Sequence, residues 1–497
     1  MLSLSGLSWK EISDPIYGHV YYNKEIEERV LGTLPVQRLR YILQLQTAHL
    51  VYPGAVHTRF QHSIGVMHLA GVMAEDVLRK LVRFVGPEAL AGYSVDELVE
   101  AGRLAGLLHD IGHGPFGHTF EEAVLWRGGV SPEVANHERV GLLVYRHTLK
   151  DLVDDLGKKS GFSDLAGVVE ELLGPGEPRT PVLRLVRRVI KDSYYPADVL
   201  DFLRRDSYYA GTGEYGSINH EKLVKNTYPN PRDVSELVLE RGGLGEFKAY
   251  MTAKASMYHH VYYHSVARAF DRILYDILVL LDEELGLRSA VNAVARGEVR
   301  DFLLLTDAGL YDLMLRESVR EGSRLGQLAR ALLVERKPSW KRVGREVVVT
   351  PFKRGWSTLK VLRLAYDKSI RERVRRELEE ELAGAVGLAR EDIWVDVVDI
   401  TPLPRSVIYS LKGEPLIALG TCEVSGNRIV LDNPLDLVAE GLPLTVLVRG
   451  YVRREKYSMD YEPRFSAVVN DYLEELAGEI PESAVDLEAY QHMKITS

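Results

Sequence analysis

The residues with the clearest chemical potential are His109 and Asp110, an adjacent imidazole and carboxylate at the end of a nearly apolar stretch, residues 95–108. Two further histidines, His113 and His118, follow closely. A carboxylate at a buried helix end costs several kcal/mol unless a partner compensates it. A metal ion supplies that compensation, because imidazole and carboxylate together suit Fe, Mn, Zn or Mg. The alternative is a His-Asp pair that is exposed at a helix end and binds nothing.

Two other positions are candidates for completing such a site. His62 opens a run with apolar residues at helical spacing, residues 66–73, which predicts a core helix. Asp198 lies at the start of another predicted helix. The alternative for Asp198 is an acid on a helix surface, because Asp201 and Arg205 have the i,i+4 spacing of a surface ion pair.

These side chains need helices to position them. Residues 62–81 and 95–108 carry apolar residues on most faces, which predicts two central helices. Residues from about 25 to 325 indicate helix after helix, and residues 253–285 predict one long helix. Glycine-containing loops are expected at residues 86–87, 128–129, 174–176 and 242–243, and residues 211–216 form a turn that ends the helix bearing Asp206.

The pattern changes from about residue 341. Runs of β-branched residues bounded by turn signals predict strands at residues 346–350, 393–398, 407–410 and 444–448. A highly charged helix is expected at residues 368–383. We therefore predict a mainly α protein, with a large helical domain over residues 1–335 followed by a smaller α+β domain over residues 336–497.

Composition narrows the class of protein. The chain has 497 residues, of which 46% are hydrophobic and 27% charged, an ordinary globular mixture. Its net charge of -9 argues against a surface built for nucleic acid, which is therefore not indicated as a partner. The single cysteine, Cys422, excludes an intramolecular disulfide and a multi-cysteine zinc site. Without a signal sequence or a membrane-spanning apolar run, a cytoplasmic protein is expected, and the residue usage is typical of a thermophile.

Several motifs occur in series along the first half of the chain. They are residues 14–19 (DPIYGH), 37–42 (QRLRYI), 52–55 (YPGA), 59–63 (RFQHS) and 109–116 (HDIGHGPF). With the ordered set His62, His109, Asp110 and Asp198, this series resembles the HD-domain phosphohydrolase superfamily, and within it the HD-domain deoxynucleoside triphosphate triphosphohydrolases. The resemblance is densest from about residue 10 to residue 206. Because the motifs begin near Met1, no sterile-alpha-motif domain is expected before them.

The resemblance implies that His62, His109, Asp110 and Asp198 are the metal ligands. Two imidazoles and two carboxylates leave positions on an octahedral ion for water and a substrate phosphate. A histidine-rich set favours a divalent transition metal (Fe, Mn, Zn or Ni) over Mg²⁺, which prefers oxygen ligands. An additional Mg²⁺ is left open.

Four further residues are candidates for proton transfer, because hydrolysis needs groups that titrate near neutral pH. The resemblance places the counterparts of His113 and His137 beside the scissile phosphate and pairs those of His118 and Glu121. Glu121 is one methylene longer than the aspartate of the family's mammalian member. The alternative for all four is capping or structural hydrogen bonding.

The resemblance also identifies residues that would grip the substrate. Arg59 and Lys254 match phosphate-contacting positions, Gln44 and Asp206 match residues that hold the sugar 3′-hydroxyl, and Tyr262 matches an aromatic beside the base. The alternative for each is an ordinary helix-face or core contact. Two positions depart from the mammalian member: Val199 replaces a phosphate-binding lysine, and Phe202 replaces a tyrosine against the sugar.

A regulatory nucleotide site between subunits is a further property of the family. The residues that match its lining are Lys10, Gln37, Arg40, Arg449 and Arg453. Gly32 replaces an aspartate that reads a guanine edge, and Ser265 replaces a lysine that grips effector phosphate. The alternative for Arg449 and Arg453 is an exposed basic strand end. We expect a homo-oligomer, a tetramer or a dimer of dimers.

The leading hypothesis is therefore a metal-dependent enzyme that hydrolyses a deoxynucleoside triphosphate to deoxynucleoside and tripolyphosphate. One alternative is a phosphatase or phosphodiesterase that acts on another nucleotide, which the missing cation at Val199 favours. Another is a nucleotide- or nucleic-acid-binding regulator with an idle site. The intact ligand set argues against idleness, because four clustered polar side chains in apolar helices need compensation.

Overall fold

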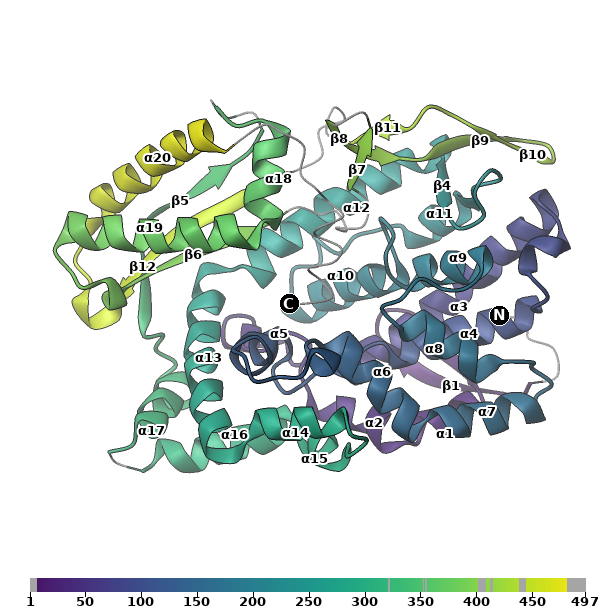
Figure 1. The fold of residues 1–497 in the computed structure, drawn as a ribbon, viewed down its shortest axis with the longest axis horizontal. Coiled ribbons are helices and arrows are strands. Elements are labelled where there is room, and N and C mark those ends of the chain that lie inside the picture. The colour runs from purple at the N-terminus through teal and green to yellow at the C-terminus, as the bar shows by residue number, and fades with distance from the viewer. Residues whose placement is uncertain are drawn as a thin grey trace.

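A computed structural model describes residues 7–320, 322–351, 353, 355–400, 408–411, 414–437 and 444–480. Most of the described chain before residue 330 is helical (Figure 1). In chain order its α-helices are α1 (Glu27–Leu31), α2 (Leu34–Gln37), α3 (Arg59–Phe84), α4 (Val95–Leu108), α5 (Gly117–Phe120), α6 (His137–Thr148), α7 (Lys150–Lys159), α8 (Leu165–Leu173), α9 (Pro181–Ile190), α10 (Ala197–Ala210), α11 (His220–Lys225), α12 (Leu244–Met257), α13 (Ser265–Leu285), α14 (Leu287–Val294), α15 (Arg300–Leu304), α16 (Asp307–Ser318) and α17 (Arg324–Ala329).

The strands and the remaining helices complete the fold. The strands are β1 (Trp9–Asp14), β2 (Gly18–Asn23), β3 (Thr227–Pro229), β4 (Leu237–Glu240), β5 (Trp340–Val349), β6 (Ile393–Asp399), β7 (Ile408–Leu411), β8 (Glu414–Leu419), β9 (Thr421–Ser425), β10 (Arg428–Leu431), β11 (Leu435–Asp436) and β12 (Val446–Arg453). The late helices are α18 (Thr358–Tyr366), α19 (Lys368–Val386) and α20 (Tyr461–Glu479). The predicted mainly α class is confirmed. The predicted strand runs overlap β5, β6, β7 and β12, although Thr350, Leu444 and Thr445 lie just outside the strands and Val407 is outside the described residues.

The two predicted central helices pack against each other and bury most of their residues. α4 has the predicted bounds, and α3 begins slightly earlier than predicted. Their backbones approach closely at Gly106, where an added Cβ would lie 3.0 Å from the carbonyl oxygen of Val66. This close packing brings the start of α3 near the end of α4, which are the two places where His62 and His109 lie.

The prediction of one long helix over residues 253–285 is wrong. α12 ends at Met257, a π-helical turn covers Tyr258–Tyr262, and α13 starts at Ser265. Carbonyl groups at the break are bonded by β12 instead: Arg449 donates to the carbonyl of Tyr263, and the Tyr451 hydroxyl donates to that of Ser265. Tertiary hydrogen bonds from β12 thus reach backbone carbonyls at this break between the helices.

The expectation of helices throughout residues 25–325 is wrong at β3 and β4. These strands belong to a four-stranded sheet of order β10-β9-β4-β3, in which β4 pairs with β9 in parallel at Leu239 and Thr421. The pairing of β4 with β9 therefore crosses the predicted domain boundary after residue 335. Two further C-terminal sheets have the orders β11-β8-β7 and β5-β12-β6, and α19 and α20 pack against the second (Figure 1). Among the described helices, none has the length and apolarity to cross a membrane.

Candidate metal and catalytic centre

The start of α3 is fixed by a capping box. Thr58 is the N-cap, and the Gln61 side chain accepts a hydrogen bond from the Thr58 backbone at 2.8 Å. This places Arg59 and His62 in the first turns of the helix, where both are buried. His109 is the C-terminal boundary residue of α4, and Asp110 follows it. Asp198 lies in the first turn of α10.

The four predicted metal ligands converge from these three helix ends. His62 Nε2 lies 3.2 Å from His109 Nε2 and 3.1 Å from Asp198 Oδ1. His109 Nε2 lies 3.3 Å from Asp110 Oδ1, and His62 Nε2 lies 4.0 Å from Asp110 Oδ2. Adjacent ligands at about 2.1 Å from one metal ion are separated by about 3 Å. The ligand atoms of His62, His109 and Asp198 all lie within 4.8 Å of one another and are spaced for a shared ion, and Asp110 adjoins them through its contact with His109.

Both imidazoles present the nitrogen that a metal requires. His62 donates its Nδ1 proton to Asp201 Oδ2 at 2.8 Å, and His109 donates its Nδ1 proton to the Gly106 carbonyl at 2.8 Å. The Nε2 atom of each ring is therefore left to face the cluster, which is the arrangement found in metal-binding histidines. The donor set fits a divalent transition metal.

The electrostatics of the metal-free cluster lead to the same conclusion. Burial lowers the pKa of His62, but hydrogen bonds to Asp198 and Asp201 outweigh burial and raise that pKa to about 10. Burial alone would raise the pKa of Asp110, whereas the charges of His109 and Arg59 hold it well below its usual range. The carboxylates around His62 thus favour a positive charge at this position, which a bound cation would also supply.

Arg59 is placed at the edge of the ligand cluster. Its Nη1 atom donates to Asp110 Oδ2 at 2.7 Å, so Oδ1 is the Asp110 oxygen that remains for a metal. The Arg59 Nε atom is buried and has no hydrogen-bond partner among the described residues. The predicted phosphate contact of Arg59 would supply an acceptor for the guanidinium.

The predicted proton-transfer residues form one group beside the metal ligands. Glu121 bridges two imidazoles: Oε1 accepts from His137 Nδ1 at 2.6 Å, and Oε2 accepts from His118 Nδ1 at 2.9 Å. His113 stacks on His137, and its Nε2 lies 3.4 Å from Asp110 Oδ1. The structure therefore connects Asp110 to Glu121 through two stacked imidazole rings.

Local backbone features turn these side chains toward one another. Phe116 adopts φ +58° and Gly117 φ +51°, so two successive left-handed residues separate His113 from His118. The strained Phe116 is held by a hydrogen bond from its amide to Asp307 Oδ1 at 2.7 Å. Glu121 begins a π-helical turn, Glu121–Leu125, a feature that often occurs at functional sites.

The charge states within this group differ. Burial would raise the pKa of Glu121, but His137 and His118 hold it well below its usual range. Burial lowers the pKa of His137, and Glu121 outweighs that effect and raises it. The pKa of His113 is held well below its usual range by burial and by the charges of Arg59 and His137. The surroundings therefore favour the ionised form of Glu121, the protonated form of His137 and the neutral form of His113.

Asp206, a predicted sugar-contacting residue, is hydrogen-bonded to Tyr262, the predicted neighbour of the base. Asp206 Oδ2 accepts from the Tyr262 hydroxyl at 2.8 Å, and Oδ1 accepts from His57 Nε2 at 2.7 Å. The backbone amide of Gln44 donates to the backbone carbonyl of His57. The side-chain oxygen of Gln44, Oε1, is buried with no partner among the described residues. Tyr262 lies in the π-helical turn Tyr258–Tyr262, edge-to-face with Phe202.

Lys254 is buried on α12, close enough to Asp198 to interact with its charge. Burial lowers the pKa of Lys254 to about 8, although Asp198 acts in the opposite direction. A phosphate bound at this position would favour the charged ammonium. The predicted phosphate role of Lys254 is therefore compatible with its surroundings and stays a prediction.

The predicted regulatory residues have partners within the single chain. Lys10 pairs with Glu28, and Arg40 donates to Gln37 Oε1. Arg449 is buried, and its Nη2 atom lies 2.7 Å from Glu346 Oε2, so the alternative of an exposed strand end is wrong for Arg449. The guanidinium of Arg453 lies over the Trp340 ring.

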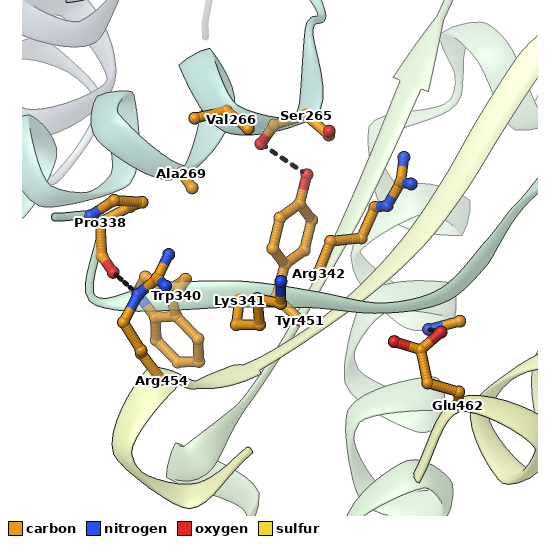
Figure 2. A pocket seen from close by; sticks show the side chains of 11 residues that line it. Ser265, Val266, Ala269, Pro338, Trp340, Lys341, Arg342, Tyr451, Arg454 and Glu462 are labelled. Carbon is orange, nitrogen blue, oxygen red and sulfur yellow. Dashed lines mark hydrogen bonds between the residues drawn. The ribbon is translucent and has the colours of Figure 1, made fainter. Parts of the chain in front are cut away.

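A pocket of about 270 Å³ lies between the start of α13 and the C-terminal sheet (Figure 2). Ser265 lines it, and Lys341, Arg342 and Arg454 supply its positive charge. The Trp340 Nε1 atom beside it is buried with no partner among the described residues. Although Ser265 itself is uncharged, Lys341 and Arg342 of β5 and Arg454 place positive charge in the pocket that it lines.

Sequence reasoning missed three residues that organise the site: His57, Asp201 and Asp307. Asp201 was interpreted as part of a surface ion pair with Arg205, which is wrong, because both side chains are fully buried. The signal that was available for His57 was its place two residues before Arg59 in the capping segment. Asp307 is far from the motifs in sequence and gave no signal.

Comparisons with known proteins agree with this geometry. Residues 59–191 match the family model of the HD domain, a range that includes His62, His109 and Asp110. The chain is 30% identical over 277 residues to the uncharacterized protein YwfO of Bacillus subtilis, covering 54% of this chain and 55% of that protein. It is 27% identical over 300 residues to the deoxynucleoside triphosphate triphosphohydrolase SAMHD1 of Homo sapiens, covering 56% and 46%. The chain spans about half the length of the curated relatives it matches.

Two solved structures share the fold. A hypothetical protein from Aquifex aeolicus has a TM-score of 0.62 at 22% identity, covering 93% of this chain and 100% of that one. A phosphohydrolase from Bacteroides thetaiotaomicron has a TM-score of 0.61 at 21% identity, covering 90% and 100%. Residues 59–191 therefore match the HD-domain family model, and the chain is similar in sequence to a deoxynucleoside triphosphate triphosphohydrolase.

Proposed function

We propose that this protein hydrolyses deoxynucleoside triphosphates to deoxynucleoside and tripolyphosphate with a divalent transition metal held by His62, His109, Asp110 and Asp198. The observation that supports this most is the convergence of the two Nε2 atoms with Asp198 and Asp110, each imidazole being locked by its Nδ1 hydrogen bond. A bound metal would act as a Lewis acid on a phosphoryl oxygen.

Arg59 and Lys254 would bind the triphosphate. Arg59 already lies against Asp110, and Lys254 lies within electrostatic range of Asp198, so both cations border the ligand cluster. Fixed cations at these positions neutralise charge that grows on phosphate oxygens during bond cleavage, without reorganising at the moment of reaction.

His137 would deliver a proton to the leaving oxygen. Glu121 orients its ring through the Nδ1 hydrogen bond and favours the protonated imidazole, while leaving the Nε2 proton available. The neutral His113 ring, packed against His137, keeps that ring in one plane. His118, whose side chain is 62% exposed, would exchange protons between Glu121 and solvent.

Asp206, Tyr262 and Gln44 would recognise the deoxynucleoside. Asp206 has a second lone pair on each oxygen, so it can accept from a sugar hydroxyl while keeping its bonds to Tyr262 and His57. The unpartnered Gln44 oxygen is a second acceptor for the same hydroxyl.

Hydrolysis of another nucleotide is the second candidate, acting as a phosphatase or phosphodiesterase. The observation that favours it is the apolar Val199 beside Asp198, at the position where the family's mammalian member has a phosphate-binding lysine. A homo-oligomer, either a tetramer or a dimer of dimers, remains part of the proposal.

The test is a panel of deoxynucleoside triphosphates, ribonucleoside triphosphates and cyclic nucleotides, incubated with Mn²⁺ or Mg²⁺. Release of tripolyphosphate from deoxynucleoside triphosphates is expected. Release of only pyrophosphate or orthophosphate would favour the second candidate, and no product from any nucleotide would contradict both. The control is the double variant His109→Ala with Asp110→Ala, which should release nothing.

A further inference from the structure

We infer that Asp201, held in place by Arg205 and Asp14, is a positioning residue that directs His62 toward the metal. This inference deepens the proposed function and rests on its metal site. Asp201 is not one of the four ligands, and it lies on α10 one turn after Asp198.

The contacts form a buried chain behind His62. Asp201 Oδ2 accepts from His62 Nδ1 at 2.8 Å and from Arg205 Nε at 2.9 Å, and Asp201 Oδ1 accepts from Arg205 Nη2 at 2.9 Å. The side chains of Asp201 and Arg205 are both 0% exposed. The two-point contact with the guanidinium fixes the plane of the carboxylate, so the carboxylate in turn fixes the plane of the imidazole.

Arg205 is itself anchored from a third element. Its Nη1 atom donates to Asp14 Oδ2 at 2.7 Å. The other Asp14 oxygen accepts from the backbone amides of Ile16 and Tyr17, in the turn between β1 and β2. The orientation of His62 is therefore tied to the β1–β2 hairpin, which contributes no metal ligand.

The helix that carries His62, α3, leaves room for the side chains of Asp201 and Arg205 at Gly65. Gly65 lies on α3 near His62, and a Cβ at this position would overlap Asp201 Oδ1 and the Nη2 atom of Arg205. Glycine inside a helix costs about 0.5–1 kcal/mol relative to alanine. The space it provides lets a carboxylate lie directly against the backbone of α3, behind the imidazole.

The contacts of Asp201 with His62 and Arg205 also prevent Asp201 from being a metal ligand itself. Both of its oxygens are occupied, and releasing either would leave the buried Arg205 charge short of an acceptor, which is costly. Asp201 thus acts on the metal only through His62. An ordinary structural ion pair would stabilise the fold equally well but would leave metal affinity unchanged.

The experiment compares Asp201→Asn with the wild-type protein in the absence of any nucleotide. Asparagine offers one uncharged acceptor oxygen in place of two carboxylate oxygens, so the hydrogen bond from His62 Nδ1 is either lost or weakened, and Arg205 loses at least one acceptor. Affinity for Co²⁺, measured by competition with a chelator, is expected to fall about 10- to 100-fold. The visible absorption spectrum of bound Co²⁺ should also change, because the imidazole direction changes.

The matched control is Asp312→Asn. Asp312 also forms an i,i+4 pair with an arginine, Arg316, but both side chains are exposed. This variant should bind Co²⁺ as the wild type does. An Asp201→Asn protein that keeps wild-type affinity and spectrum would overturn the inference, whatever its thermal stability.

Two other variants keep the inference testable if Asp201→Asn does not fold. Asp14→Asn leaves the His62–Asp201 hydrogen bond intact and loosens only Arg205, so a smaller loss of Co²⁺ affinity is expected. Gly65→Ala should displace Asp201 and weaken Co²⁺ binding. If both variants fold and bind Co²⁺ with wild-type affinity, the inference that Asp201, Arg205 and Asp14 position His62 is refuted.

Failure of this inference and failure of the proposed function give different results. A wild-type protein that binds Co²⁺ more tightly than Asp201→Asn but releases no tripolyphosphate would refute the function and keep the inference. If the wild-type protein hydrolyses deoxynucleoside triphosphates but binds Co²⁺ no more tightly than Asp201→Asn does, the proposed function is kept and the inference is refuted.

Discussion

His113 and His137 lie face to face, with ring centroids 3.8 Å apart and planes inclined by 14°. The stack depends on Gly112, because a Cβ there would overlap the carbonyl oxygen of His137 and the backbone of Gly141. It places an imidazole whose pKa is raised beside one whose pKa is held well below its usual range. Two adjacent rings are thus prepared for different roles.

We predict that His137→Ala reduces turnover about 10²- to 10⁴-fold, the usual contribution of a proton-transferring group. Metal content should stay nearly unchanged, since His137 contacts Glu121 and His113 and is not one of the four ligands. Steady-state kinetics and elemental analysis of the same preparation check both parts. Wild-type turnover in the variant would assign His137 a structural role.

We predict that Glu121→Gln moves the alkaline limb of the pH–rate profile to lower pH. Burial lowers the pKa of His137 and Glu121 raises it, so removing the carboxylate charge lowers that pKa. An acid is active below its pKa, so the active range should contract from the alkaline side. The measurement is kcat as a function of pH, and an alkaline limb that does not move would contradict the role of Glu121.

We predict about one transition metal ion per chain, as expected for a single four-ligand site. The double variant His109→Ala with Asp110→Ala should lose most of it. Because hydrogen bonds to Asp198 and Asp201 raise the pKa of metal-free His62 to about 10, metal uptake near pH 7 should release a proton. Elemental analysis and proton release in weak buffer test this. Equal metal content in the wild type and the double variant would refute the assignment of His109 and Asp110 as metal ligands.

We predict hydrolysis of deoxynucleoside triphosphates without strict dependence on a guanine nucleotide. Gly32 has no side chain to read a guanine edge, and Ser265 carries no charge for effector phosphate. If those contacts supply most of the coupling energy, usually about 1–3 kcal/mol, the effector requirement is relaxed. Turnover of each substrate with and without GTP is the measurement, and complete inactivity of dATP, dCTP and dTTP until GTP is added would refute the prediction.

We predict a homo-oligomer in solution. The reason is the resemblance across both parts of the chain, including the matched positions Lys10, Arg40 and Arg449. Light scattering should give a mass of two or four chains, with or without nucleotides. A single-chain mass under every condition would count against the prediction.

The sequence by itself predicted the candidate ligands and the central scaffold. The order His62, His109, Asp110, Asp198 predicted the ligand types, and in the structure the ligand atoms of His62, His109 and Asp198 lie within 4.8 Å of one another, with Asp110 Oδ1 3.3 Å from His109 Nε2. Apolar periodicity predicted α3 and α4, because a helix that is buried on most faces is apolar on most faces. The change to β-branched runs predicted the late strands for a similar local reason.

The tertiary structure alone decided how these pieces are held. Asp201 and Arg205 have the spacing of a surface pair, and only the packing of α10 on α3 buries them behind His62. Side chains of β12 bond to carbonyls at the break before α13, and β4 pairs with the distant β9 as well as with its neighbour β3. Each of these features depends on partners far away in the chain, and local propensity and periodicity carry no information about such partners.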